Sequence, residues 1–402
     1  MRVREYVRLA SAVFAIFVGL SAAIGVALVG QTASQAGTSP RTPWGEPDLQ
    51  GIWTEEFDTP LERPERYGNR ELLTDEEYAE IDGRRAAALD SQQQADGDRR
   101  DERGSERDVA GAYSDAFLSF KHMGRRTSLI VDPPNGRIPP LTEEAQARAA
   151  AEREFRLELL RSTETCRNEL PQCAGGAYDP TPSPRRSELP PRYNTTRMNR
   201  HDHPEDGALG DRCMAGQIPE FGTAFGGSFR RIVQTPGGIS IFYDVGQGQG
   251  FQRNIVMNGS PHLPDHVRQW WGDSRGHWEG DTLVVDVTNF SPQRDFRGSR
   301  ENLHLIERWT RTGPDTLEYE VTLEDPTVWV SPWTVRQEFR KQSDELNRIY
   351  YEPRCHEGNY GFPALLRAAR IADQRYAEGT GPHPATYDNA SGAGIDRFAG
   401  VP

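Results

Sequence analysis

Ionisable side chains interrupt an otherwise apolar strand pattern between residues 302 and 309, which read Asn-Leu-His-Leu-Ile-Glu-Arg-Trp. The next segment, residues 316–324, alternates cleanly between apolar and polar residues. In one register of this hairpin Glu307 faces the core, and in the register shifted by one residue His304 and Arg308 face it instead. Burying a charge costs several kcal/mol unless the charge is paired. The inward group is therefore either a structural ion pair or a general acid–base group beside a wet cavity.

A second candidate lies in the hairpin of residues 270–286, where the Gly-Asp pair at 280–281 is expected to form a two-residue turn. This turn fixes which residues share a face, because cross-strand partners point to the same side. One face is then apolar and comprises Ser274, Gly276, Trp278, Leu283, Val285 and Val287. The other face is polar and comprises Asp273, Arg275, His277, Glu279, Thr282, Asp286 and Thr288. The polar face either is solvated or lines a cavity in which Asp273 and His277 are available for acid–base chemistry.

A third candidate follows the last expected strand, where Cys355 precedes the residues His-Glu-Gly-Asn-Tyr-Gly. This short segment contains two glycines and four side chains able to form hydrogen bonds. His356, Asn359 and Tyr360 therefore lie either on a tight loop that positions them at the mouth of a barrel or on an ordinary surface turn.

Metal binding is an alternative use of the histidines. One such site would combine His304, His356 and a carboxylate, which are ligand types that zinc and other transition metals accept. The His-Asp-His triplet at 201–203 also offers ligands. Because Pro204 and polar residues surround the triplet, we expect it to be a surface loop.

Four cysteines allow three disulfide connectivities, and we expect the local pairing Cys166–Cys173 with Cys213–Cys355. An alternative makes Cys355 a nucleophile that is activated by His356. Adjacent residues on a strand point to opposite faces, so their adjacency alone does not create a catalytic pair.

The elements that must position these residues are mostly short strands. Segments rich in Val, Ile, Tyr, Trp and Thr recur between turn residues from residue 229 onward. The sequence predicts strands at 229–235, 238–245, 251–257, 267–278, 282–290, 302–311, 316–324, 333–341 and 347–352. It predicts helices that begin after Thr74, after Thr142 and near residue 362. The expected fold class is α+β, with an antiparallel β-barrel or curved β-meander, packed N-terminal helices and a C-terminal helix.

Charge and the N-terminal segment indicate where the protein acts. The 402 residues carry a net charge of −13, which argues against broad binding to nucleic acid or to anionic membranes. Three arginines precede an apolar run at residues 9–30, and small residues follow at 34–36. This order is typical of a secretory signal, although the run is long enough to be an uncleaved membrane anchor. We expect a periplasmic or secreted protein that contacts a membrane only through this segment, if it is uncleaved.

The expected organisation has four parts. Residues 1–36 are the signal peptide or anchor, and residues 37–214 form a region of helices and loops that packs on the barrel. Residues 215–355 form the barrel itself, and residues 356–402 form a closing helix and tail. Each boundary rests on a change in composition along the chain.

Three motifs are distributed along the chain: Thr-Pro-Trp-Gly-x-Pro-Asp-Leu-Gln-Gly-Ile-Trp at 42–53, Gly-Asp-Ser-Arg-Gly-His-Trp-Glu-Gly-Asp-Thr-Leu at 272–283 and Cys-His-Glu-Gly-Asn-Tyr-Gly at 355–361. With these motifs the chain resembles a large family of exported bacterial proteins with no established activity. The motifs span nearly the whole chain after the signal. The resemblance therefore implies one integrated unit and assigns no catalytic residue.

The resulting hypothesis is a barrel with an internal pocket for an apolar, aromatic or sugar-like molecule. In its enzymatic form the protein is a cofactor-independent lyase, isomerase or hydrolase, with no metal. The proton-transfer candidates are His304, Glu307 and His356, with Asp273 orienting a histidine. The expected ligand contacts are Trp278, His277, Trp309, Tyr360 and Asn359. The alternatives are a lipocalin-like binding protein without catalysis, the metal-dependent enzyme and a sugar-binding surface protein.

Overall fold

The computed structural model describes most of the chain after the N-terminal segment. The described residues are 40–55, 59–84, 86–87, 124–214, 216–221, 229–244, 250–342 and 355–390. The chain divides into a first unit, Met1–Pro40, and a second unit, Arg41–Pro402, which holds every element discussed below. The expected signal at 1–36 and the expected strand at 347–352 lie outside the described residues. Among the described residues, no helix has the length and apolar character needed to cross a membrane.

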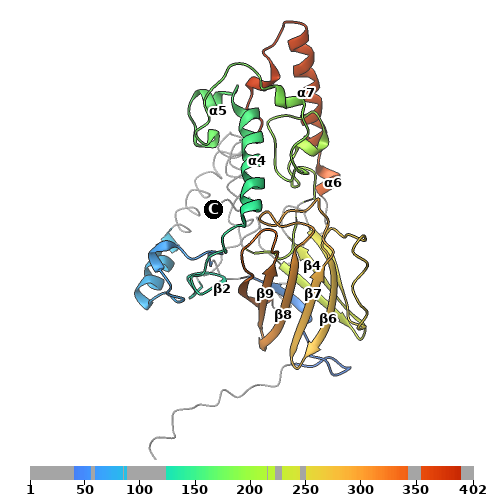
Figure 1. Ribbon diagram of the computed structural model, residues 1–402. Helices are drawn as coiled ribbons and strands as arrows, with labels where there is room; N and C mark the ends of the chain where they lie inside the picture. The colour runs from blue at the N-terminus through green and yellow to red at the C-terminus, as the bar shows by residue number, and fades with distance from the viewer. Residues whose placement is uncertain are drawn as a thin grey trace, which may run out of the picture. The chain divides into compact units, whose positions relative to one another are not determined.

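Nine strands in the described part of the chain form a closed β-barrel (Figure 1). They are β1 (Gly51–Thr54), β3 (Phe229–Thr235), β4 (Gly238–Asp244), β5 (Gly250–Val256), β6 (Asp273–Glu279), β7 (Thr282–Thr288), β8 (His304–Gly313), β9 (Thr316–Glu324) and β10 (Trp333–Lys341). They follow one another around the barrel in sequence order, and β1 pairs with β10 to close it. The short strand β2 (Ile130–Asp132) pairs with the other end of the same edge of β10. The expected α+β fold with a barrel is confirmed.

The barrel is mixed and not wholly antiparallel. Every neighbouring pair is antiparallel except β5 and β6, which run parallel where Val256 lies opposite Arg275. Antiparallel neighbours need only a tight turn, whereas a parallel pair needs a longer return connection. Residues 257–272 supply that connection, so the expectation of a simple antiparallel meander is corrected at this one step.

Most expected strands agree with the structure to within two residues, because their alternation of apolar and polar residues matches the two faces of the barrel wall. The largest boundary error is β6, which begins at residue 273 and not at 267. Gly272 has a positive φ of 71°, and its N–H donates to the carbonyl of Gln269 in a turn just before the strand. The sequence analysis missed β1 and β2, which are only four and three residues long.

The helices begin where capping residues predict. The Thr142 hydroxyl accepts a hydrogen bond from the N–H of Ala145 at the start of α4 (Glu143–Leu160). Thr74 and Glu77 bond reciprocally, as a capping box does, and the helix that follows is described only to residue 87. The closing helix is α7 (Gly361–Ala377). Two short helices, α5 (Glu164–Arg167) and α6 (Cys355–Gly358), complete the set used below.

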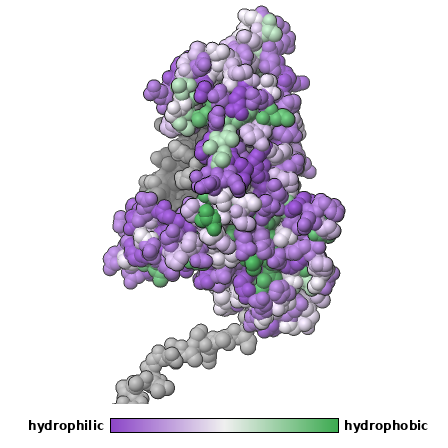
Figure 2. All heavy atoms as spheres, viewed as in Figure 1, coloured by the Kyte–Doolittle hydropathy of each residue, from purple (hydrophilic) through white to green (hydrophobic). Residues whose placement is uncertain are grey.

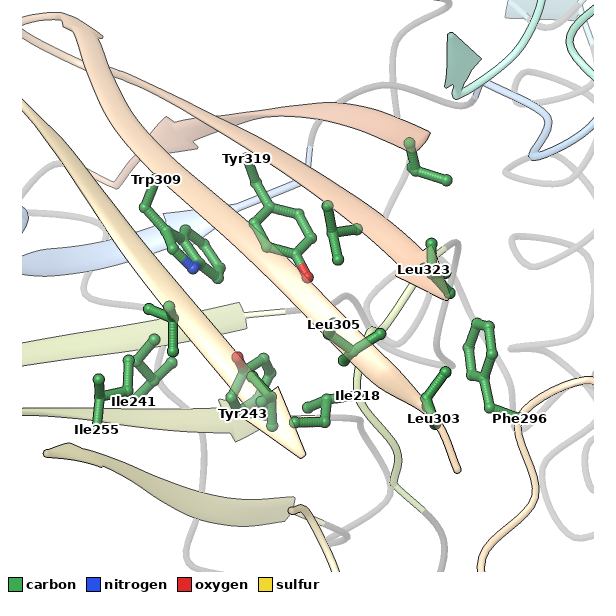
Figure 3. Close-up of a cluster of buried hydrophobic side chains, with 14 of the residues drawn as sticks. Ile218, Ile241, Tyr243, Ile255, Phe296, Leu303, Leu305, Trp309, Tyr319 and Leu323 are labelled. Carbon is green, nitrogen blue, oxygen red and sulfur yellow. The ribbon is translucent and has the colours of Figure 1, made fainter. Parts of the chain in front are cut away.

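The core fills the inside of the barrel with aromatic and aliphatic side chains (Figure 3). Trp309 and Tyr319 lie side by side with ring centres 4.2 Å apart, and both are at most 2 % exposed. Hydrophilic residues dominate the face of the molecule seen in Figure 2, where hydrophobic residues form only small patches. The barrel therefore buries its apolar surface in the usual way, and polar groups found inside it need a separate explanation.

Candidate functional site

The register of β8 decides which ionisable group enters the barrel. Leu305 lies opposite Leu323, and Glu307 lies opposite Val321, so Glu307 faces inward and is fully buried. His304 lies on the outer face. The register that would place His304 and Arg308 inside is therefore wrong, because it would expose the leucines that fill this end of the core.

Glu307 forms a buried ion pair with Arg253 of β5. Arg253 Nη1 donates to Glu307 Oε1 at 3.0 Å, and Nη2 donates to Oε2 at 2.5 Å. The hydroxyl of Tyr319 donates to Glu307 Oε1 at 2.7 Å, and Arg253 Nε donates to Ser274 Oγ at 2.8 Å. Burial and the neighbouring carboxylate of Glu307 hold the pKa of Tyr319 well above its usual value. The carboxylate of Glu307 is thus held in place as a hydrogen-bond acceptor. Of the two expectations for the inward-facing group, a structural ion pair or an acid–base group, this arrangement matches the structural ion pair.

Other polar groups in the interior have no hydrogen-bond partner among the residues that the structure describes. Both amide atoms of Gln337 are buried without a hydrogen bond, and the residue is 2 % exposed. The indole N–H groups of Trp309 and Trp333 are buried and unpartnered as well. Tyr319 of β9 lies opposite Trp309 on one side and opposite Gln337 on the other. Trp309, Tyr319 and Gln337 therefore form one inward-facing row across three strands, which we call the interior row.

Arg230 of β3 adds a second set of unpartnered donors. Its Nη2 donates to the carbonyl of Glu220 at 3.0 Å, whereas Nε and Nη1 are buried without a hydrogen bond. Its guanidinium carbon lies 4.3 Å from the ring centre of Phe339. A cation over an aromatic face gains some attraction, but that contact does not satisfy the N–H groups.

A chain of alternating carboxylates and imidazoles crosses the outer face of the barrel. His262 Nδ1 lies 2.9 Å from Asp273 Oδ2, and His262 Nε2 lies 2.8 Å from Asp286 Oδ1. His304 Nε2 lies 3.0 Å from Asp286 Oδ2, and His304 Nδ1 lies 3.0 Å from Glu324 Oε2. We call these five residues the histidine–carboxylate chain. It joins the predicted proton carrier His304 to Asp273, which was predicted to orient a histidine, through two residues that were not predicted as site residues.

The charges along this chain support one another. Hydrogen bonding to Asp286, together with its charge and that of Glu324, raises the pKa of His304 despite partial burial. The same contacts with His304 lower the pKa of Asp286. Burial raises the pKa of Asp273, but hydrogen bonds from Arg275 and from a backbone N–H outweigh burial and lower it. Since both ring nitrogens of His304 face carboxylates, both bonds can be donated together only by a protonated ring.

The predicted hairpin turn is confirmed, and it separates the two faces as expected. Trp278 lies opposite Leu283 and packs partly buried against the core. His277 lies on the outer face, is exposed, and has its Nε2 3.3 Å from Glu279 Oε1. The structure therefore connects Asp273 to His304 through His262 and Asp286. His277 lies outside this histidine–carboxylate chain.

The third candidate segment, which begins at Cys355, is mostly helical, because it forms α6 and leads into α7. It is therefore not the tight loop that was expected. His356 is exposed within α6, and Tyr360 is 82 % exposed. Asn359 Nδ2 donates to the carbonyl of Asp211 at 2.8 Å, and its Oδ1 accepts from the N–H of Phe362 at 3.2 Å. The amide of Asn359 is thus occupied in holding the start of α7. None of these contacts brings the segment to His304 or Glu307.

Both expected disulfides, Cys166–Cys173 and Cys213–Cys355, are confirmed. Cys355 is therefore not a free thiol. Among the described residues, no group of three or more His, Cys, Asp or Glu side chains is arranged to hold a metal ion.

The His-Asp-His triplet at 201–203 is more ordered than a surface loop. His201 is buried, and burial lowers its pKa. The N–H groups of Asp202 and His203 both donate to Asp206 Oδ2 at 2.9 Å. The expected exposed loop is thus corrected for His201, because Asp206 folds the backbone of the triplet onto itself.

Sequence analysis missed a small open hollow at one end of the barrel, whose enclosed space is about that of one water molecule. Its lining comprises Ile218, Phe290, Arg294, Asp295, Phe296, Ser299, Arg300 and Leu303. Ile218, Leu303 and Phe296 lie together at this end of the core in Figure 3. The segment that carries most of these residues, 290–303, has no periodic pattern, so only the folded chain could reveal the hollow.

No family model and no curated protein matches the chain. Solved structures to which it has some similarity include a fatty-acid-binding protein of Echinococcus granulosus, at 9 % identity and a TM-score of 0.20. A variant of the fluorescent protein UnaG aligns at 15 % identity and a TM-score of 0.19. Each alignment covers 29 % of this chain and 73 % of the other. Scores this low carry no argument about function.

Proposed function

We propose that this protein is a small-molecule-binding barrel, in which a ligand brings its polar group to the interior row. The main support for this proposal is the buried amide of Gln337. Its nitrogen and its oxygen have no hydrogen-bond partner among the described residues, so the amide offers a donor and an acceptor side by side. Leaving such a group unpaired costs about 1–3 kcal/mol, and native interiors rarely keep one without a water, a ligand or a function to satisfy it.

The surroundings of Gln337 indicate what such a ligand carries. The amide presents both hydrogen-bond roles, and the Trp309 indole on the same row adds another donor. Phe339 adds a further aromatic ring beside the row, with its centre 6.3 Å from the ring centre of Tyr319. A carboxamide, hydroxyl or carbonyl group on an apolar or aromatic body complements this combination.

The test compares Gln337→Leu with a matched exterior variant, Gln252→Leu. Gln252 is exposed on the outer face of β5, so its replacement should leave ligand binding unchanged. Small molecules that co-purify with the protein, or that raise its Tm in a library screen, are titrated by calorimetry. We expect Gln337→Leu to weaken binding at least tenfold while raising the Tm of the ligand-free protein. Equal binding by the wild type and Gln337→Leu would refute the role of the interior row, and the absence of any ligand would refute the function.

Acid–base catalysis is a second candidate, and one observation favours it. His304 is partly exposed, has a raised pKa and lies in a continuous chain with Asp273. Both ring nitrogens of His304 are engaged by carboxylates, so proton transfer to a substrate would require one of those bonds to open. His304→Gln should abolish turnover of any substrate found by screening while the protein remains folded. Unchanged turnover would remove this candidate.

We also propose that the protein is exported. The basic and apolar N-terminal pattern supports export, and so do the two disulfides, which persist in oxidising compartments. N-terminal sequencing of protein from a periplasmic or extracellular fraction should find a chain that begins after Ala36. Recovery of the full-length chain in the cytoplasm alone would contradict export.

A further inference from the structure

Arg294 is a buried cation at the end of the barrel with no acid to neutralise it. The residue is 7 % exposed and lines the hollow beside Phe290 and Phe296. Among the described residues, its guanidinium has no hydrogen-bond or ion-pair partner. Its one close contact is with Trp270, whose ring centre lies 5.2 Å from the guanidinium carbon. A guanidinium carries five N–H donors, and none of the Arg294 nitrogens is among the fully buried, unpartnered atoms of the described residues, so these donors remain accessible to a ligand from the hollow.

The carboxylate of Asp295, which lines the hollow together with Arg294, is paired elsewhere. Asp295 Oδ2 accepts from Arg300 Nε at 3.1 Å, and Asp295 Oδ1 accepts from the N–H of Gly298 at 3.0 Å. Arg300 also donates to two backbone carbonyls. The two arginines and the one aspartate that line the hollow therefore leave one net positive charge there. Burial lowers the pKa of Arg294 to about 10, which is the expected consequence of desolvating a cation without a partner.

We propose that this hollow binds the carboxylate of a small organic acid, with Arg294 as its counter-ion and the body of the acid lying at the open, partly apolar mouth. A planar guanidinium pairs a carboxylate through two parallel hydrogen bonds. Ile218, Phe290 and Leu303 favour an aryl or alkyl body over a fully hydrated ion. One net positive charge matches a monoanion better than a phosphate dianion. This site is separate from the interior row, so ligand binding at one site can be tested independently of binding at the other.

The test titrates the wild-type protein with benzoate, hexanoate, benzamide, benzylamine and inorganic phosphate by calorimetry. Benzoate and benzamide have nearly the same shape, so their comparison isolates the charge without any mutation. We expect benzoate and hexanoate to bind at least tenfold more tightly than benzamide, and benzylamine not to bind. Equal affinities for benzoate and benzamide would overturn the proposal, and so would preferential binding of phosphate.

Variants then assign the binding to Arg294. We expect Arg294→Gln to reduce benzoate affinity at least tenfold and Arg294→Lys to reduce it less, because lysine keeps the charge but loses the planar fork. Arg153→Gln, on the exposed face of α4, is the matched control and should bind as the wild type does. Full benzoate affinity in a folded Arg294→Gln protein would place the acid elsewhere. The variant Gln337→Leu should leave benzoate binding intact, which distinguishes this site from the interior row.

Discussion

Replacing Arg294 by methionine should stabilise the ligand-free protein. Methionine retains most of the aliphatic stem of arginine, so it keeps much of the packing of that stem while it removes the charge. Removal of a cation that supports the fold would lower stability. A cation that is buried to bind a ligand, by contrast, destabilises the folded state while the ligand is absent. Its removal should then raise the free energy of unfolding of the ligand-free protein.

The structure sets the size of this effect. Burial brings the pKa of Arg294 down to about 10, which is roughly two units or more below an unperturbed guanidinium. Each pKa unit corresponds to about 1.36 kcal/mol, so the buried charge costs the folded state about 3 kcal/mol. Loss of the contact with Trp270 offsets about 1 kcal/mol of this gain. The net expectation is a gain of about 2 kcal/mol in the free energy of unfolding.

Urea unfolding of the wild type and of Arg294→Met in ligand-free buffer measures the difference. The pKa is lowered in the folded state, so the cost is fully present below pH 10 and falls as the pH rises through that value. The advantage of the variant should therefore be constant between pH 6 and 9 and should shrink above pH 10. A variant that is less stable than the wild type at neutral pH would show that Arg294 supports the fold, and the reasoning would fail.

Three further predictions concern the other features of the structure. Glu307→Leu leaves Arg253 buried without its carboxylate and should lower the free energy of unfolding by about 3–5 kcal/mol, whereas adding Arg253→Met should recover most of that loss in urea unfolding; equal losses in the single and double variants would contradict this. The raised pKa of His304 stabilises the fold fully below its unfolded value of about 6.5, and that contribution is lost as the pH rises through the folded pKa. The wild type should therefore exceed His304→Gln in stability at pH 6 by more than at pH 9, and a difference that grew with pH would be inconsistent. Replacing Cys213 and Cys355 by serine opens a loop with a sequence separation of 142 and should cost about 5 kcal/mol in the chain-entropy model; calorimetry that finds an unchanged Tm would rule this out.

The strand pattern was predictable because side chains alternate along the barrel wall. In the hairpin of β6 and β7, the Gly-Asp turn placed Trp278 opposite Leu283, as the structure has it. For β8, the sequence showed that an ionisable group must face the core, and Glu307 does. Its partner Arg253 could not be predicted, since β5 precedes β8 by some fifty residues and nothing local pairs them.

The remaining site features depend on irregular segments, which carry no periodic signal. His262 lies in the connection between β5 and β6, so nothing in its spacing relates it to Asp286. Arg294 matters because no acidic side chain among the described residues pairs with it. Only the folded arrangement of the neighbouring charges reveals this. The sequence of β1 resembles a turn-rich segment because its four residues begin with Gly51 and are followed directly by acidic residues.

The closure of the barrel by β1 has a consequence for the order of folding. Trp53 of β1 lies opposite Lys341 of β10, so the two strands that seal the wall come from nearly opposite ends of the described chain. Such a distant contact forms late, because the entropy of bringing the ends together must be overcome before the pairing is gained. Until β10 has been synthesised, β1 and the most recently formed strand remain unpaired edges, and the nascent chain is exposed to edge-to-edge aggregation during that interval.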